Sequence, residues 1–436
     1  MWNLFALIVF EVLLFIAAYY FSGFDIMAPS CMMCIMFIIS TTIALLNLDN
    51  WNISFGLYTS ILIGSGLLVY VLAEIFFRFF FCGQLRGPYS TSEEHDCKRI
   101  YISTTLANAI IVFNIVILYL YLRGIIRIVG ENLSNLGSYF HAYRVLGIKS
   151  LENGTSMTSG FINFALKFVA ASGYLSGYLL MRNYALKSES RITQVKYIVI
   201  LLLSILPSVM SGGRTGILRM LSALLVFYYI SWHQHNGWER NLSWKYIRLG
   251  LGAFFILAPS FYYSLALLGR ATNRTLTDYV ADYISSSICL FDAYLKDPVP
   301  CVSWGEESLV GVKKILSVIG IGEPSTKYNL EFRTLGIGRS NVYTFFRRPL
   351  HDFGLIGMYI FVACIAFLFA YIYFEKIKHR PQRSCAGWVI AYGYLNYWIL
   401  VSPIVQYSVN MISVGAAVQI GIAVLGYYIF TKETAE

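Results

Sequence analysis

Arginine is the residue type whose placement in this sequence most strongly suggests chemistry. Arg214 lies in the stretch SGGRTG, directly after the apolar run YIVILLLSILPSVM, and other arginines occur in LLGRATNRTL and EFRTLGIGRSNVYTFFRRPLHDFG. A guanidinium is a planar set of donors that fits two phosphate oxygens at once. We expect the glycines beside it to let the backbone approach a ligand and to leave N–H donors free. The pattern predicts a phosphate or pyrophosphate site with these candidate residues: Arg214, Arg270, Arg274, Arg339, Arg347 and Arg348.

The elements that must position these arginines are membrane-spanning helices. The 436 residues are 57% hydrophobic and 13% charged, whereas an ordinary soluble domain has about 25% charged residues. Apolar runs of roughly 20 residues, the length that crosses a bilayer as a helix, recur along the chain. We therefore predict an all-α polytopic membrane protein. The net charge of +10 does not indicate nucleic-acid binding, because the sequence has no aromatic-basic module; basic cytoplasmic loops and an anionic ligand explain it.

The apolar runs predict about eleven spans. They fall at residues 2–21, 31–48, 55–80, 104–122, 159–181, 197–211, 214–232, 247–268, 353–374, 388–407 and 411–430. This divides the chain into a membrane domain of spans one to eight, a long hydrophilic loop and a second membrane part with the last three spans. The respective ranges are 1–268, 269–352 and 353–436.

The distribution of Lys and Arg predicts the orientation. The loops 182–196, 233–248 and 375–385 are rich in Lys and Arg and fall on one side, which is therefore cytoplasmic. Segments 123–158 and 269–352 are then external, and Arg214 lies at the same external face. The loops near the N-terminus hold no Lys or Arg, so the side of the N-terminus stays open. A single arginine at a membrane boundary can simply snorkel, with its apolar stem in the membrane and its guanidinium in water. The prediction of a ligand site therefore depends on all the candidate arginines meeting at that boundary.

Four stretches resemble the Wzy-type O-antigen polymerases, which polymerise oligosaccharide repeat units and are related to the O-antigen ligases. They are SGGRTG after an apolar span, DYISSSICLFDAYL in the long loop, RSNVYTFFRRPLHDFGLIGM at its exit and FDIMAPS after the first span. The layout is similar over nearly the full chain. The resemblance implies a glycosyltransferase of the third broad membrane type (GT-C-like), in the bacterial inner membrane with its site at the periplasmic face. Its substrates would be undecaprenyl-pyrophosphate-linked oligosaccharides, the growing glycan passing to a new repeat unit, and a partner protein would regulate chain length.

The resemblance also implies roles for particular residues. External arginines are expected to be essential in this family, and the matching positions here are Arg214, Arg270, Arg274, Arg339 and Arg348. Asp352 matches the family's aspartate before Phe-Gly, and His351 is similar to a loop histidine of the ligases, although the residues around it differ.

Sugar transfer from a lipid pyrophosphate needs charge neutralisation at the leaving group and a base near the acceptor hydroxyl. The external segments contain no Asp-x-Asp pair, so we expect catalysis without metal or other cofactor, by arginines on the pyrophosphate and Arg347 or Arg348 on the acceptor's lipid phosphate. Tyr343 is expected to stack on a sugar ring. The candidate bases are Asp352, Glu331 and His351.

Two other functions fit the same layout. An O-antigen ligase would use the same lipid-linked donor with a lipid A core acceptor, and the sequence pattern does not separate it from a polymerase. A flippase or transporter of the lipid-linked units would instead show charged residues along the middle of the membrane and two similar halves. The chain shows no such repeat, and its arginines cluster at the ends of one long loop.

Overall fold

The described residues of the computed structural model form two compact units, and each unit combines stretches that are far apart in the sequence. Unit 1 consists of Met1–Gly87, Arg274–Lys378 and Trp398–Val414, and unit 2 of Pro88–Asn273, His379–Tyr397 and Gly415–Glu436. The structure describes residues 1–82, 100–130, 133, 135–152, 157–186, 191–238, 262–263, 275–323, 329–336, 338–378, 380, 382–405 and 411–433.

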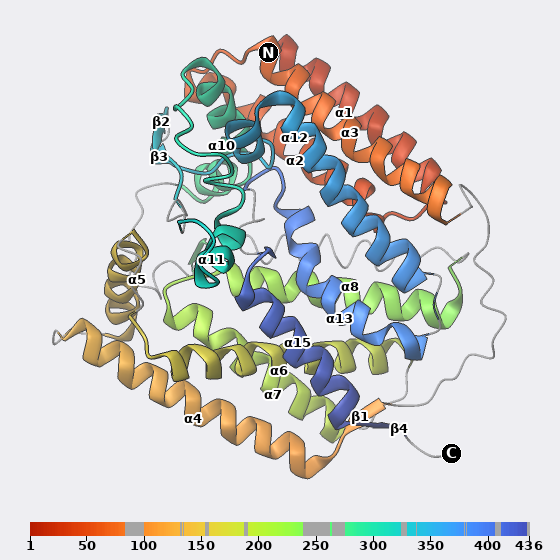
Figure 1. The fold of residues 1–436 in the computed structure, drawn as a ribbon, viewed down its shortest axis with the longest axis vertical. Coiled ribbons are helices and arrows are strands. Elements are labelled where there is room, and N and C mark those ends of the chain that lie inside the picture. The colour runs from red at the N-terminus through yellow and green to blue at the C-terminus, as the bar shows by residue number, and fades with distance from the viewer. Residues whose placement is uncertain are drawn as a thin grey trace. The chain divides into compact units, whose positions relative to one another are not determined.

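Long apolar helices dominate both units, which confirms the expected all-α polytopic membrane protein (Figure 1). Among the described residues, eight helices are long and apolar enough to cross a membrane. They are α1 (Trp2–Phe21), α2 (Pro29–Trp51), α3 (Leu57–Phe81), α4 (Thr104–Val129), α6 (Gly160–Ala185), α7 (Arg191–Met210), α8 (Thr215–Asn236) and α12 (Arg347–Ala370) with its continuation η1 (Tyr371–Lys378).

These eight helices match the first seven predicted spans and the ninth. The eighth predicted span, 247–268, lies almost entirely outside the described residues. The tenth corresponds to α13 (Gln382–Leu400), which is not among these eight, and the eleventh to the shorter α15 (Val414–Phe430). The predicted total of eleven spans therefore stays a prediction.

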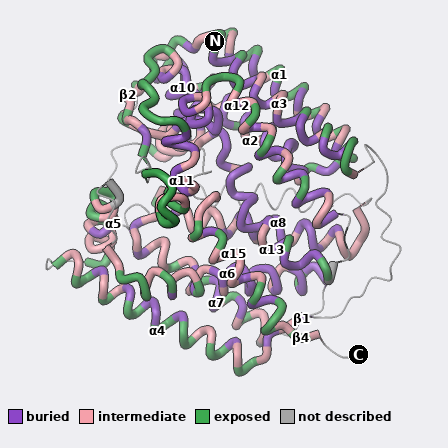
Figure 2. Tube along the Cα trace, in the orientation of Figure 1, coloured by how far each residue is buried: buried purple, intermediate pink, exposed green. Residues whose placement is uncertain are grey.

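Unit 1 is built on α1, α2, α3 and α12, and α1 packs against both α2 and α3. The approach of α12 to α3 depends on a missing side chain, because a Cβ at Gly66 would lie 2.5 Å from the ring of Phe346. The chain just before α12 is bonded to the segment that starts at Trp398, because the N–H of Phe345 donates to the carbonyl of Ser402 at 2.8 Å. Many residues of these four helices are buried (Figure 2).

The segment predicted as a long hydrophilic loop contains regular structure of its own. It forms the helices α10 (Leu276–Lys296) and α11 (Val310–Val318) and an antiparallel hairpin of β2 (Arg333–Leu335) and β3 (Gly338–Ser340). Helix α10 begins where Thr275 Oγ1 accepts the N–H of Asp278 at 3.2 Å, a side-chain N-cap. Its second half is buried and packs against α2.

A buried carboxylate fastens α10 to the start of α3. Asp292 Oδ1 accepts the N–H of Gly56 at 2.9 Å and the hydroxyl of Thr59 at 2.5 Å. Its other oxygen lies 2.6 Å from the ammonium of Lys296. The carboxylate thus satisfies donors that the first turn of α3 would otherwise leave unpaired.

Helix α12 begins six residues before the predicted span and is kinked. Gly354 has φ 67° and ψ −171°, a backbone conformation that is essentially restricted to glycine. The residues before the kink therefore form a short helical turn, set at an angle to the long apolar segment that follows. This turn carries Arg347, Arg348, His351 and Asp352.

Unit 2 contains α4, α6, α7, α8, α13, α15 and the additional helix α5 (Leu136–Glu152). Helix α6 packs against α7 and α8. A short antiparallel pair, β1 (Ile100–Ile102) with β4 (Thr431–Glu433), joins the start of α4 to the end of α15.

Candidate functional site

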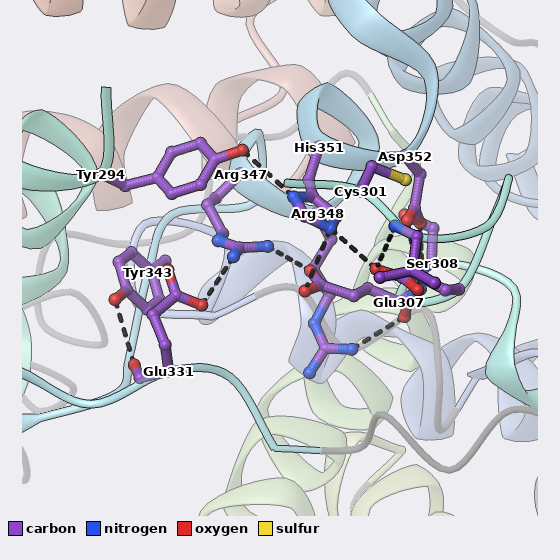
Figure 3. Close-up of polar contacts among 12 residues, drawn as sticks. Tyr294, Cys301, Glu307, Ser308, Glu331, Tyr343, Arg347, Arg348, His351 and Asp352 are labelled. Atoms are coloured by element: carbon purple, nitrogen blue, oxygen red, sulfur yellow. Dashed lines mark hydrogen bonds and ion pairs between the residues drawn. The ribbon is translucent and has the colours of Figure 1, made fainter. Parts of the chain in front are cut away.

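A cluster of ionisable side chains, most of them buried, forms around the first turn of α12 in unit 1 (Figure 3). Three further stretches of the segment predicted as a hydrophilic loop contribute side chains. They are the end of α10, the turn at residues 301–308, and the residues that flank the β2–β3 hairpin. The members are Tyr294, Cys301, Glu306, Glu307, Glu331, Tyr343, Arg347, Arg348, His351 and Asp352.

Arg347 is at the centre of the cluster and is fully buried. Its Nη2 donates to Glu331 Oε2 at 2.6 Å, and its Nη1 donates to Glu307 Oε2. The guanidinium also lies over the ring of Tyr294, 4.3 Å from the ring centroid. Two carboxylates thus compensate its charge inside the protein, so Arg347 joins segments of this chain together.

Arg348 and Asp352 hold the turn at residues 303–308. Arg348 Nη1 donates to the carbonyl of Glu307 at 2.7 Å. The carboxylate of Asp352 accepts the N–H of Glu307 at 3.2 Å and that of Ser308 at 2.5 Å (Figure 3). Both carboxylate oxygens of Asp352 therefore take part in positioning backbone.

His351 faces carboxylates with one ring nitrogen and a phenol with the other. Its Nε2 lies 3.1 Å from Glu306 Oε1 and 3.5 Å from Glu307 Oε1. Its Nδ1 lies 3.2 Å from the hydroxyl of Tyr294. Glu306 is held in turn by the backbone N–H groups of Val302 and Ser303, each at 3.3 Å. The arrangement can accept a proton or hold a cation at Nε2.

Burial changes the acidity of several groups here. Removal from water raises the pKa of Glu307, although Arg347 and His351 act in the opposite direction. Burial also raises the pKa of Tyr294 and that of Tyr343. Both phenols therefore stay neutral, and the hydroxyl of Tyr343 donates to the carbonyl of Glu331 at 3.1 Å.

The structure brings together six of the predicted site residues: Arg347, Arg348, Tyr343, Glu331, His351 and Asp352. Tyr343 is completely buried, with its hydroxyl bonded to backbone. Glu331 binds Arg347 and lies 3.8 Å from Nε of Arg333. Among the three predicted bases, His351 therefore has the contacts that best suit acid–base work.

The other predicted arginines do not belong to this cluster. Arg339 is exposed on β3, where its guanidinium lies 5.1 Å from the ring centroid of Phe332. Arg270 and Arg274 lie outside the described residues. Arg214 belongs to unit 2, so its predicted meeting with the arginines of unit 1 stays a prediction.

Arg214 is buried at the N-terminal end of α8, after a tight turn. The N–H of Gly212 donates to Val209 O and that of Gly213 to Ser208 O, each at 2.8 Å. The expectation that these glycines leave N–H donors free for a ligand is therefore wrong, because the turn uses them. Arg144 of α5 also donates to the carbonyl of Gly212, at 2.7 Å.

Glu306, Glu307 and Tyr294 were not among the residues predicted for the site. The adjacent acids Glu306 and Glu307 are visible in the stretch SWGEESLV, but their meeting with His351, over forty residues further on, depends on tertiary structure. Within the described part of the chain, two groups of side chains have ligand atoms within 4.8 Å of one another and could hold a metal ion. They are Glu306 with Glu307 and His351, and Cys301 with His351 and Asp352.

An apolar pocket lies in the same unit, between α2, α3, α12 and the segment that starts at Trp398. Its lining includes Phe345, two residues before Arg347 in the sequence. The other lining residues are Met33, Tyr70, Ile365, Phe369, Trp398, Ile399, Ser402 and Met411.

Comparison with known proteins leaves the family open. No protein-family model matches the chain, and neither a curated protein nor a solved structure matches it.

Proposed function

We propose that the protein is a membrane glycosyltransferase of the GT-C-like type and an O-antigen polymerase. In this proposal it acts at the periplasmic face of the bacterial inner membrane. A hydroxyl of a new lipid-linked repeat unit attacks the anomeric carbon of the growing glycan. The bond from that carbon to undecaprenyl pyrophosphate breaks, the hydroxyl proton passes to the site, and the anomeric carbon is inverted.

The observation that carries the proposal is the position of His351 and Glu306. Their ring nitrogen and carboxylate oxygen are 3.1 Å apart, both side chains are buried, and His351 lies in the first turn of a membrane-spanning helix. Activation of a sugar hydroxyl needs such a group beside the lipid that carries the sugar. We therefore place the activation of the acceptor hydroxyl at these two residues.

The binding of the pyrophosphate falls, in this proposal, to arginines outside the cluster. Arg347 is engaged by two carboxylates and Arg348 holds the carbonyl of Glu307, so neither guanidinium offers its full fork to a substrate. Arg339 is exposed, and in the described part of the chain its guanidinium contacts the ring of Phe332. We therefore assign the pyrophosphate to Arg339 in unit 1, and the roles of Arg214, Arg270 and Arg274 stay predictions from the sequence.

The glycan phenotype of a deletion strain tests the proposal. A polymerase predicts lipopolysaccharide capped with a single repeat unit. Free core with polymer accumulating on its lipid carrier would instead identify a ligase. Lipid-linked units retained on the cytoplasmic side would identify a flippase, and either result would overturn the polymerase assignment.

Complementation of that strain tests the site. His351→Ala and Glu306→Gln are expected to abolish the polymer ladder at normal protein levels, a loss of at least about 100-fold for a group that transfers a proton. The matched control is Glu323→Gln, because Glu323 is an exposed glutamate of the same segment. Full ladders from both site variants would rule out this site.

A further inference from the structure

We propose that Glu306, Glu307 and His351 bind one divalent transition-metal cation of the zinc class. This replaces the expectation of a metal-free site, which rested on the absence of an Asp-x-Asp pair in the external sequence. The cluster uses an adjacent Glu-Glu pair and a histidine instead, and all three side chains are buried.

The spacing of the ligand atoms fits one ion. His351 Nε2 lies 3.1 Å from Glu306 Oε1 and 3.5 Å from Glu307 Oε1. Zinc bonds to histidine nitrogen and carboxylate oxygen are about 2.0–2.2 Å long, so ligand atoms at the corners of a tetrahedron lie roughly 3.3–3.6 Å apart. The observed separations are close to these tetrahedral edges. One proton on Nε2 can serve a single straight hydrogen bond, whereas a cation attracts both oxygens.

Each ligand is held from behind by a second contact, as in protein metal sites. The other ring nitrogen of His351 meets the hydroxyl of Tyr294 at 3.2 Å, which can fix the neutral tautomer with Nε2 unprotonated. The second oxygen of Glu307 accepts from Arg347, and the second oxygen of Glu306 accepts from the N–H of Ser303. The oxygen of each glutamate that faces His351 is thus directed there by the protein.

The local charge leaves room for a cation. Among the residues that the structure describes there, the cluster has four carboxylates, Glu306, Glu307, Glu331 and Asp352, and two guanidiniums, Arg347 and Arg348. Arg333 and Asp297 pair beside it and add one charge of each sign. Lys313, whose ammonium donates to Ser303 Oγ at 3.2 Å at the edge of the cluster, reduces this balance to one negative charge, which a bound cation would offset.

Three protein ligands leave one zinc position open, the pattern of catalytic sites. Cys301 is exposed and its sulfur lies within 4.8 Å of ligand atoms of His351 and Asp352, so the cluster reaches solvent at Cys301. If the proposed function holds, the open position would take the acceptor hydroxyl, and His351 and Glu306 would activate it through the cation, which would lower its pKa, rather than as direct proton acceptors. The binding of the metal does not depend on that reaction.

Metal content of the full-length protein tests the inference. Protein purified in detergent, equilibrated with Zn²⁺ and then freed of unbound metal, should retain about one zinc per chain by elemental analysis. His351→Ala and Glu306→Gln should each lower the affinity for zinc by at least about tenfold, because losing even a residue that supports a metal ligand lowers affinity by that much. The control Glu323→Gln, in the same segment and exposed, should bind as wild type does.

A spectroscopic measurement on the wild type covers the case in which a variant fails to fold. Co²⁺ in place of Zn²⁺ should give the visible absorption of a tetrahedral nitrogen–oxygen site, and Zn²⁺ should raise the Tm by a few degrees, roughly, through binding to the folded state. Absence of both, or zinc retained equally by His351→Ala and Glu306→Gln, would overturn the proposal. Neither result depends on the glycan ladder, so the proposed function stands or fails separately.

Discussion

The guanidinium of Arg347 lies 2.6 Å from the carboxylate of Glu331, and the same guanidinium binds Glu307. One buried cation therefore connects the first turn of α12 to two separate parts of the preceding segment. Removing one partner of such a buried network leaves the others as uncompensated charges, which costs far more than losing an exposed ion pair.

We predict that Arg347→Met lowers the free energy of unfolding by about 3–5 kcal/mol, since two buried carboxylates lose their counterion. Thermal or denaturant unfolding of the purified protein in detergent measures this. The control is Arg339→Met, which removes an exposed arginine and should change stability by less than about 1 kcal/mol. Equal stability of the two variants would show that Arg347 does not organise the cluster.

The same pair of substitutions separates structural from substrate-binding arginines. If Arg339 binds pyrophosphate, Arg339→Met should abolish polymer ladders while protein level and Tm stay at wild-type values. Arg347→Met should instead lower the amount of folded protein, and any loss of polymer should follow from that. A normal ladder from Arg339→Met would remove this residue from the proposed pyrophosphate site.

Replacing Gly354 by any residue with a side chain is predicted to destabilise the protein. Its φ of 67° and ψ of −171° are strained for other residues, at about 1–3 kcal/mol, although no atom lies within 4 Å of an added Cβ. Gly354→Ala should therefore lower the Tm through backbone strain alone. Gly124→Ala is the matched control, because this glycine of α4 also has open space around it but sits in a regular helix. There alanine should stabilise by about 0.5–1 kcal/mol.

The spans could be predicted because burial in lipid is encoded by local composition. A run of apolar residues long enough to cross a bilayer has few alternatives to a helix. The first span was predicted at 2–21 and is found at Trp2–Phe21, and the fourth also begins at the predicted residue, Thr104. The start of α12 was misplaced by six residues, because its first turn carries Arg347, Arg348, His351 and Asp352 and has no apolar pattern.

The site could be predicted in part, for a different physical reason. Asp352, His351 and the two arginines are neighbours in the sequence, so their proximity needed no fold. Whether an arginine faces a ligand or a carboxylate of its own chain depends on which distant residues pack against it. Arg347 meets Glu307 and Glu331 only in the folded chain, and the sequence pattern carries no record of that contact.

Asp292 is predicted to be required for docking α10 onto α3. Asp292→Asn removes the charge that binds Lys296 at Oδ2 and leaves one acceptor oxygen, so the amide NH2 must face either Lys296 or the donors of Gly56 and Thr59, which share Oδ1. Because some of these buried donors then lack an acceptor, the substitution should lower the free energy of unfolding by about 1–3 kcal/mol. The control Asp297→Asn alters an aspartate that is 87% exposed and should cost less than about 1 kcal/mol. Equal Tm values for the two variants would mean that α10 is held by its apolar face alone.

The turn before Arg214 gives the last prediction, in unit 2. Gly212 has φ 69°, and a Cβ there would lie 2.9 Å from the carbonyl oxygen of Phe140 and 3.0 Å from Arg144 Cβ. Gly212→Ala should therefore cost at least about 1–2 kcal/mol, the left-handed penalty of a side chain, and displace the turn that sets Arg214. Its neighbour is a built-in control, since a Cβ at Gly213 would meet nothing closer than 3.4 Å.

Unfolding measurements on both variants test the turn, and the polymer ladder tests Arg214. Gly213→Ala should keep the wild-type Tm, because its added methyl group makes ordinary contacts. If Arg214 binds substrate, Gly212→Ala should lose more activity than its folded fraction explains, since the arginine follows the displaced turn directly in sequence. Activity that falls only in proportion to folded protein would leave Arg214 a structural role at the start of α8.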